Sequence, residues 1–321
     1  MNAAWLRRAA IVLIFTTCNF WFAGAALSDE QALDSYEYKL MLQPEGFLES
    51  RRDESIVALW NKDIAESLSA VSGAEASGTS FFPEKDRAVR FWDNESCLLL
   101  RHGYAFRERV KIKDGDERKD KRKVTLKYRN EERATAAAKD LSSKESGKSK
   151  FERDVTAGRE PNSPPRSIYS KSTTQTIKSG KKLNRLDDPL GLYPALAADL
   201  EAQGAEFDED APLSVVADLT VREQVYEGPL ASLGEQGAAF SLTLWFDSEA
   251  GSLDRPLLAE LSFKVENAAG QAADAEVLAR AERLFEALLD LPQRDASACT
   301  KTRSLYAGAT SCNLDIHCDG E

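Results

Sequence analysis

Six segments of the chain alternate charged or polar residues with apolar residues at a period of two, which predicts β-strands with one charged face and one apolar face. In the first segment Glu37 and Lys39 alternate with Tyr38 and Leu40. The segments are 35–42, 104–113, 124–129, 150–155, 214–226 and 257–266. In 214–226 the alternation places Arg222 on the charged face.

In an ordinary half-buried sheet such charged faces meet water. Here, however, Arg and Lys dominate several segments, and the carboxylates are confined to a few. If the sheet closes into a barrel of about eight strands, the charged faces converge on a common lumen. The sequence therefore predicts an α+β fold, an antiparallel closed β-barrel or tunnel with helices packed outside. The side chains expected to face the lumen are Glu37, Lys39, Arg107, Arg109, Lys127, Arg129, Arg222 and Glu260.

Apolar residues at helical spacing predict helices over 56–71 and 277–288. A third predicted helix covers 187–203, with Pro189 near its start, where proline is tolerated. We expect the apolar side chains of these helices to pack on the sheet rather than to take part in chemistry.

The first 25 residues have the pattern of a secretory signal peptide. Arg7 and Arg8 precede an apolar run from Ala9 to Phe22, and small residues follow at 23–25. A membrane anchor is the alternative, but the run is short and interrupted by polar residues. We expect a signal peptide over 1–25, a single domain over 26–310 and a C-terminal tail over 311–321. The cleaved protein is expected to be exported, periplasmic or extracellular, with no stable membrane insertion.

The 321 residues include 53 Asp and Glu and 42 Lys and Arg, for a net charge of −11. The charges are unevenly spread, because 25 basic and 12 acidic residues lie between Arg101 and Arg185. A basic middle in an acidic protein indicates a local site for a small anionic ligand, or a solvated loop over 111–123. It argues against a nucleic-acid partner, because nucleic-acid-binding proteins are normally basic as a whole.

Four cysteines follow the predicted signal peptide, and an even number in an oxidising compartment favours disulfides. Of the three possible pairings we expect Cys97 with Cys299 and Cys312 with Cys318. Metal binding by cysteine is the weaker interpretation, because neither paired CxxC units nor a histidine cluster is present. GxSxG, HExxH and Walker-type motifs are also missing from the sequence, which argues against the common His-dependent hydrolases.

Several motifs follow one another in a defined order. Glu37-x-Lys39 lies on the opening strand, and TLKYR with Lys127, Lys150-x-Glu152-x-Asp154, Arg222, AELSFK and KTRSLY follow later. Between them lies VRFWDNESCLLLRHGYAFRER, in which the matching residues are Arg90, Trp92, Asp93, Leu99, Gly103, Phe106, Arg107 and Arg109.

This order resembles the CYTH superfamily, or triphosphate tunnel metalloenzymes, which includes class IV adenylyl cyclases, thiamine triphosphatases and inorganic triphosphatases. The resemblance covers roughly Ser35 to Tyr306 and implies a single CYTH-like tunnel domain. Two positions depart from the family pattern. Ser35 and Ser262 stand where the family has metal-binding glutamates.

The resemblance implies a basic cradle for a triphosphate, since arginine binds phosphate oxygens in two places. The implied ligand-binding residues are Lys39, Arg107, Arg109, Lys127, Arg129 and Arg222. It also implies Mg²⁺ or Mn²⁺ opposite the cations, held by carboxylates. The implied metal ligands are Glu37, Glu152, Asp154 and Glu260.

Three hypotheses about function stay open from the sequence. The first is a metal-dependent phosphohydrolase acting on a triphosphate, and a cyclase is favoured less. The second is a protein that binds an anionic or phosphorylated ligand without converting it, which the two serine replacements favour. The third is a scaffold whose charges form internal ion pairs.

Overall fold

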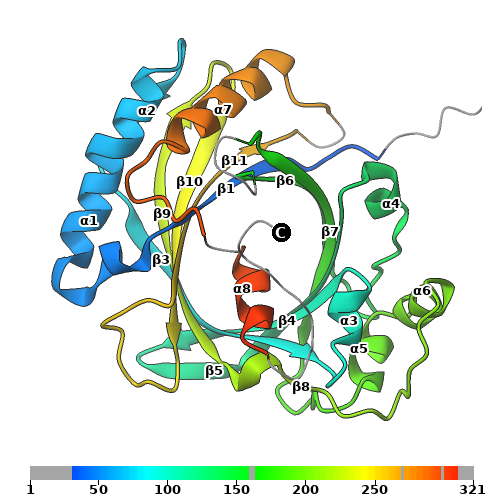
Figure 1. Cartoon of the computed structure of the whole chain (residues 1–321). Helices are drawn as coiled ribbons and strands as arrows, with labels where there is room; N and C mark the ends of the chain where they lie inside the picture. The colour runs from blue at the N-terminus through cyan, green and yellow to red at the C-terminus, as the bar shows by residue number, and fades with distance from the viewer. Residues whose placement is uncertain (1–30, 159–162, 269–270, 298–299, 310–321) are drawn as a thin grey trace, which may run out of the picture. The chain divides into compact units, whose positions relative to one another are not determined.

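Nine strands form a closed β-barrel in the computed structural model, which describes residues 31–158, 163–268, 271–297 and 300–309. Around the barrel they follow the order β9, β10, β11, β1, β6, β7, β5, β4 and β3, and β3 pairs with β9 to close the ring (Figure 1). Their bounds are β1 (Ser35–Leu42), β3 (Phe82–Asp93), β4 (Tyr104–Lys113), β5 (Asp116–Asn130), β6 (Lys148–Thr156), β7 (Arg166–Ile177), β9 (Val221–Ser232), β10 (Gly237–Asp247) and β11 (Leu258–Glu266).

The predicted closed barrel with outer helices is thus confirmed, with nine strands rather than about eight. Neighbouring strands are antiparallel except β1 and β6, which run parallel. Two short strands, β2 (Glu75–Ala76) and β8 (Ser214–Val215), pair with β9 and β3.

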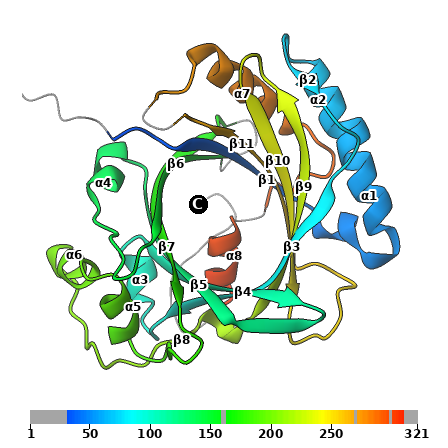
Figure 2. The ribbon, with the colours of Figure 1, turned by 180° about the vertical axis from the view of Figure 1, so that it is seen from behind.

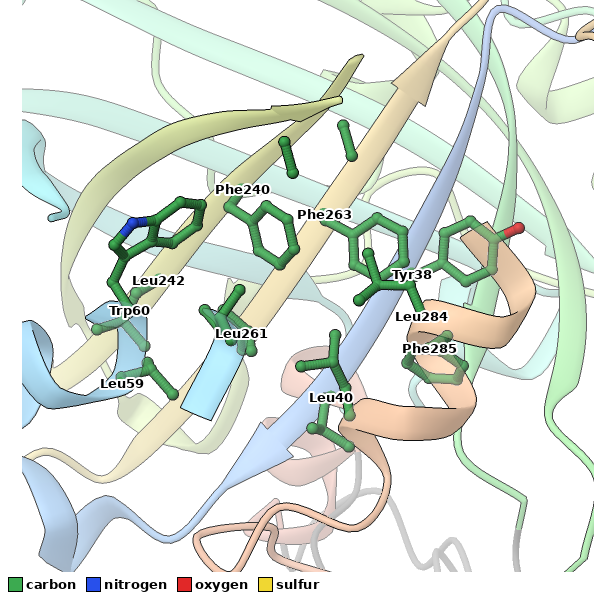
Figure 3. Close-up of a cluster of buried hydrophobic side chains, with 14 of the residues drawn as sticks. Tyr38, Leu40, Leu59, Trp60, Phe240, Leu242, Leu261, Phe263, Leu284 and Phe285 are labelled. Atoms are coloured by element: carbon green, nitrogen blue, oxygen red, sulfur yellow. The ribbon is translucent and has the colours of Figure 1, made fainter. Parts of the chain in front are cut away.

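Helices cover the outer faces of β1, β10 and β11. The segments α1 (Arg52–Ala58), η3 (Leu59–Ile64, a π-helix) and α2 (Ala65–Ser69) follow one another without a break, after η1 (Pro44–Phe47) and η2 (Glu49–Arg51). Together with α7 (Ala275–Leu288) they confirm two of the predicted helices. Trp60 and Phe285 pack from these helices onto Phe240, Phe263 and Tyr38 of the strands, as Figure 3 shows. This apolar layer fixes which face of each strand points outward.

A second apolar cluster lies on the outer faces of β4, β5 and β7. It includes side chains of α3 (Leu98–Arg101), α4 (Arg133–Ala138), α5 (Asp187–Leu192) and α6 (Leu196–Ala202). The single helix predicted over 187–203 is therefore two helices. The chain leaves the helical conformation at Tyr193 (φ −131°, ψ 85°), because the following Pro194 disfavours the α conformation at the residue before it.

One helix lies inside the barrel, which the prediction of outer helices did not include. Leu305 and Tyr306 of α8 (Lys301–Ala307) pack on Met41, Phe91 and Trp245, whose side chains point inward. Figures 1 and 2 show α8 within the ring of strands from both sides. It fills part of the interior with apolar contacts.

The strand predicted over 214–226 is interrupted. Val216–Asp218 form the 3-10 turn η4, in which Ala217 has a φ of 57°, and β9 begins only at Val221. Residues 217–220 therefore do not fix the phase of β9.

Some of the expected features lie outside the described residues. These are the signal peptide, the C-terminal tail over 311–321, and the cysteines Cys299, Cys312 and Cys318. The disulfide pairing therefore stays a prediction. None of the described helices has both the length and the hydropathy to cross a membrane.

Candidate functional site

Charged side chains from β1, β6 and β11 meet on the inner face of the barrel, and we call the region that the inner faces enclose the lumen. In register, Glu37 of β1 lies opposite Asp154 of β6 on one side and Lys264 of β11 on the other. Because side chains alternate along a strand, Lys39 and Glu152 point the same way. The outer positions between them, such as Tyr38, are buried in the apolar layer.

Glu37, Glu152 and Asp154 form a carboxylate triad. One oxygen from each lies within 4.8 Å of the other two. Glu152 and Asp154 are buried, and Glu37 is 20% exposed. Carboxylate oxygens are the donors that Mg²⁺ and Mn²⁺ take in proteins, so these three residues would be the ligands of such an ion. Three of the four implied metal ligands are thus brought together.

Lysines surround the triad at ion-pair distance. The Nζ atom of Lys39 lies 3.0 Å from Glu37 and 2.9 Å from Asp154. Lys264 Nζ lies 2.8 Å from Glu152, and Lys127 Nζ lies 3.2 Å from Asp154. The carboxylates therefore have several cationic partners within the chain itself.

These ion pairs keep the triad charged. Burial raises the pKa of Glu152, but the charges of Lys127 and Lys264 outweigh it and lower the pKa to about 2. The pKa of Asp154 is likewise lowered by Lys127, Lys39 and Arg129 against the effect of burial. Burial alone would lower the pKa of Lys39, yet Asp154 and Glu37 raise it.

Arg107 and Arg109 line the lumen from β4 and have no carboxylate within ion-pair distance among the described residues. Their Nε atoms are buried and make no hydrogen bond in that part of the chain. Burial, more than the neighbouring charges, lowers the pKa of Arg107 to about 10. The charge of Arg107, followed by burial, lowers the pKa of Arg109 to about 8. Arg109 donates from Nη2 to the hydroxyl of Thr125 at 3.4 Å, so the donors without a partner are the two Nε atoms.

Lys127 lies between the triad and the arginines. Its neighbours in register are Ala105 of β4 and Ser172 of β7. Burial lowers the pKa of Lys127 to about 8, although Asp154 opposes the shift. Nearby, the buried hydroxyl of Ser170 has no hydrogen-bond partner among the described residues. Cations and hydroxyl donors thus face the same region.

Two residues do not join this site. Arg222 faces outward, because its register partner Phe246 belongs to the outer apolar layer, and it pairs with Asp86 at 2.6 Å. The expectation that Arg222 faces the lumen was therefore wrong. Glu260 does face inward, but its carboxylate lies 2.7 Å from Lys301 of α8 and is not part of the triad.

Sequence reasoning missed several charged residues of the lumen, among them Lys264, Arg87 and Glu223. Lys264 was recognised as a strand residue but not as a partner of the triad. Arg87 and Glu223 form an ion pair across β3 and β9, and Trp245 Nε1 donates to Glu223 at 2.9 Å. If the odd-numbered residues of β9 are assigned to the inner face, Glu223 faces the lumen between Val221 and Val225, and Arg222 faces outward.

Two motif residues have structural roles. The carboxylate of Asp93 accepts hydrogen bonds from the backbone N–H groups of Leu99 and Leu100 and from the hydroxyl of Tyr306. Gly103 has a φ of 78°, and a Cβ there would lie 2.9 Å from the Tyr128 ring. The motif thus fixes the turn that leads into β4.

No protein-family model and no curated protein matches the chain. Solved structures are similar at low identity. HpAC1 from Hippeastrum, described as an adenylyl cyclase with a dominant triphosphatase activity, has a TM-score of 0.41 and 13% identity over 87% of this chain and 97% of its own. A protein from Bacillus halodurans described as an adenylate cyclase has a TM-score of 0.36 and 10% identity, over 85% and 98%. The PH1819 protein from Pyrococcus horikoshii has a TM-score of 0.32 and 11% identity, over 82% and 95%. At these values the similarity says nothing of the ligand or reaction of this chain.

The closed barrel with a charged inner face is the tunnel that the sequence motifs implied. Glu37, Lys39, Arg107, Arg109 and Lys127 all project into it. In this barrel the carboxylates of the triad and the arginines without a carboxylate partner lie on different parts of the inner face.

Proposed function

We propose that the chain is a divergent, exported CYTH-like protein whose lumen binds a phosphorylated or polyanionic ligand. The observation that carries the proposal is the pair of buried, unpartnered Nε atoms of Arg107 and Arg109. A buried donor without a partner costs free energy, and a buried charge without a partner costs more. A bound anion would remove both costs.

Phosphate groups suit this arrangement best. A guanidinium presents a planar fork of donors that matches two phosphate oxygens. Lys127 and the Ser170 hydroxyl add donors beside the arginines. A condensed phosphate has several negative charges along a short chain, so it can contact donors on β4, β5 and β7 at once.

Calorimetric titration with tripolyphosphate tests the proposal. Arg107→Ala should weaken binding by about 1.5 to 3 kcal/mol, the value of a hydrogen bond to a charged group. Arg222→Ala is the matched control, because it removes an arginine from the outer face of the same barrel. Equal affinities in wild type and Arg107→Ala would contradict the proposal.

Metal-dependent hydrolysis of a triphosphate is a second candidate, favoured by the carboxylate triad. Glu37, Glu152 and Asp154 would hold Mg²⁺ or Mn²⁺, which would polarise a phosphoryl oxygen when bound. Lys127, Arg107 and Arg109 would orient the phosphate chain. Phosphate release that requires the metal and is lost in Glu37→Gln would support this candidate.

A scaffold with internal ion pairs was the third hypothesis. Such pairs do exist, as in Arg87 with Glu223 and Glu260 with Lys301. The arginine pair argues against a purely structural lumen, because unpartnered buried charges destabilise a fold.

Export of the protein is proposed from the N-terminal sequence pattern. Expression of the full chain in a secreting host, followed by N-terminal sequencing of the exported product, tests it. A mature end near Ala26 is expected. Retention of the whole chain in the cells would contradict export.

A further inference from the structure

We propose that Lys39 and Lys264 act as built-in counter-cations of the carboxylate triad, so that the lumen binds its polyanion without a divalent metal. The inference rests on the proposed function, since it concerns how the same ligand is held. It departs from the metal use that the family resemblance implies.

Lys39 lies between two of the three carboxylates. Its Nζ atom is 3.0 Å from Oε2 of Glu37 and 2.9 Å from Oδ1 of Asp154. A metal ion held by the same groups needs their oxygens at about 2.1 Å. Lys39 therefore competes with a metal ion for the oxygen atoms that would hold it.

Lys264 forms an ion pair with Glu152, the third carboxylate of the triad. Its Nζ atom lies 2.8 Å from Oε1 of Glu152 and 3.8 Å from Oε2 of Glu37. The hydroxyl of Ser35 donates to the same Oε1 atom of Glu152 at 3.0 Å. Each member of the triad thus has a lysine partner from β1 or β11.

Positive charge exceeds negative charge around the triad. Lys127, Arg129 and Lys150 also reach a triad carboxylate within 4.0 Å, in addition to Lys39 and Lys264. A divalent ion would therefore enter surroundings that already have an excess of positive charge. The surrounding lysines and arginines repel a divalent cation at this range and attract a polyanion.

The two serines that depart from the family pattern fit this interpretation. Both serines are neutral, so neither adds a charge to the triad, and the hydroxyl of Ser35 donates to Glu152. Ser262 is the register partner of Lys39. Glutamate at either position would shift the local balance toward negative charge, the condition that a divalent ion requires.

The first experiment measures tripolyphosphate affinity by calorimetry in EDTA and in excess Mg²⁺. Binding in EDTA at least as tight as in Mg²⁺ is expected. Binding that occurs only with Mg²⁺ would overturn the inference and leave the proposed function standing. Absence of binding in both buffers would contradict the proposed function.

The second experiment measures Mn²⁺ affinity by electron paramagnetic resonance, without any phosphate ligand. Lys39→Met and Lys264→Met should each bind Mn²⁺ about tenfold more tightly than wild type, because a cation next to the triad is removed. Lys123→Met is the matched control, since Lys123 pairs in register with Arg109 on the inner face and has no ion pair with the triad. Equal Mn²⁺ affinity in wild type and both variants would overturn the inference. Thermal unfolding of each variant confirms that it is folded.

Discussion

Arg107 and Arg109 project from the same face of β4, and the charge of Arg107 is the largest cause of the lowered pKa of Arg109, about 8. Two guanidinium groups that repel each other without a carboxylate partner lower the stability of the fold. Binding sites often contain groups that lower the stability of the unliganded protein, because ligand binding requires them. The arginine pair should therefore affect stability and ligand binding in opposite directions.

Arg109→Met tests this opposition. Methionine keeps much of the aliphatic volume but removes the unpaired charge, so the free energy of unfolding should rise by about 1 kcal/mol. The same variant should bind tripolyphosphate more weakly. Urea denaturation and calorimetry give the two values. A variant that loses stability would contradict the assignment of Arg109 as a binding group without a carboxylate partner.

The lowered pKa of Lys127 should make ligand affinity fall with rising pH while the contribution of this residue to stability rises. Its pKa is lowered by burial from 10.5 to about 8, so the ammonium group loses its proton as the pH rises through about 8. Ligand affinity should fall over this range. Between about pH 8 and 10.5 the unfolded chain holds more protons at Lys127 than the folded chain, so this residue's contribution to stability rises with pH.

Calorimetry across this pH range measures the loss of affinity. Lys127→Arg is the matched control, because arginine keeps its charge at higher pH. Its affinity should depend less on pH than that of wild type. An identical pH profile in both proteins would exclude Lys127 as the titrating group.

The sequence predicted the barrel because the outer faces of strands such as β1 and β11 are apolar throughout. Tyr38, Leu40, Phe263 and Leu261 alternate with the charged residues in phase, and the helices 56–71 and 277–288 supply the cover. The phase of β9 could not be predicted in the same way. Its outer face contains both Arg222 and Tyr226, so polarity alone does not separate the faces.

The inner partners were harder to predict than the strands. Lys264 and Glu152 are 112 positions apart in the chain, and only the strand order β11, β1, β6 brings them together. The inner position of α8 is also a tertiary effect, because Leu305 and Tyr306 would suit an outer helix equally well. Motif spacing therefore located the charged strands but not the ion pairs between them.

Asp154 is expected to be the most sensitive residue of the triad for stability. Its carboxylate is almost fully buried and meets Lys39 at 2.9 Å and Lys127 at 3.2 Å. Asp154→Asn leaves both cations without this partner and should lower the free energy of unfolding by about 3 to 5 kcal/mol. Asp86→Asn, which breaks the more exposed outer pair with Arg222, should cost about 0 to 1 kcal/mol. Equal losses of the free energy of unfolding in urea denaturation would contradict the expectation that the buried pair costs more to break than the exposed one.

Ser35→Glu changes the balance of charge at the triad. It replaces the donor of a 3.0 Å hydrogen bond to Glu152 with a fourth carboxylate. Mn²⁺ affinity should rise, since like charges side by side favour a divalent cation between them. Ser241→Glu is a useful comparison, because Ser241 lies on β10, two strands from the β1 strand of Ser35, and opposite Ser262 of β11. A rise in affinity in Ser241→Glu as large as that in Ser35→Glu would show that added negative charge alone, and not its place at the triad, causes the effect.

In the proposed complex the lumen holds a polyanion between the cations of β4 and β5. A crystal structure of the protein with tripolyphosphate tests it most directly. Phosphate oxygens are expected within hydrogen-bond distance of the guanidinium groups of Arg107 and Arg109 and of Lys127 Nζ, on the inner face. Phosphate bound only on the outer face, or a lumen in which these three side chains have no contact with it, would contradict the account.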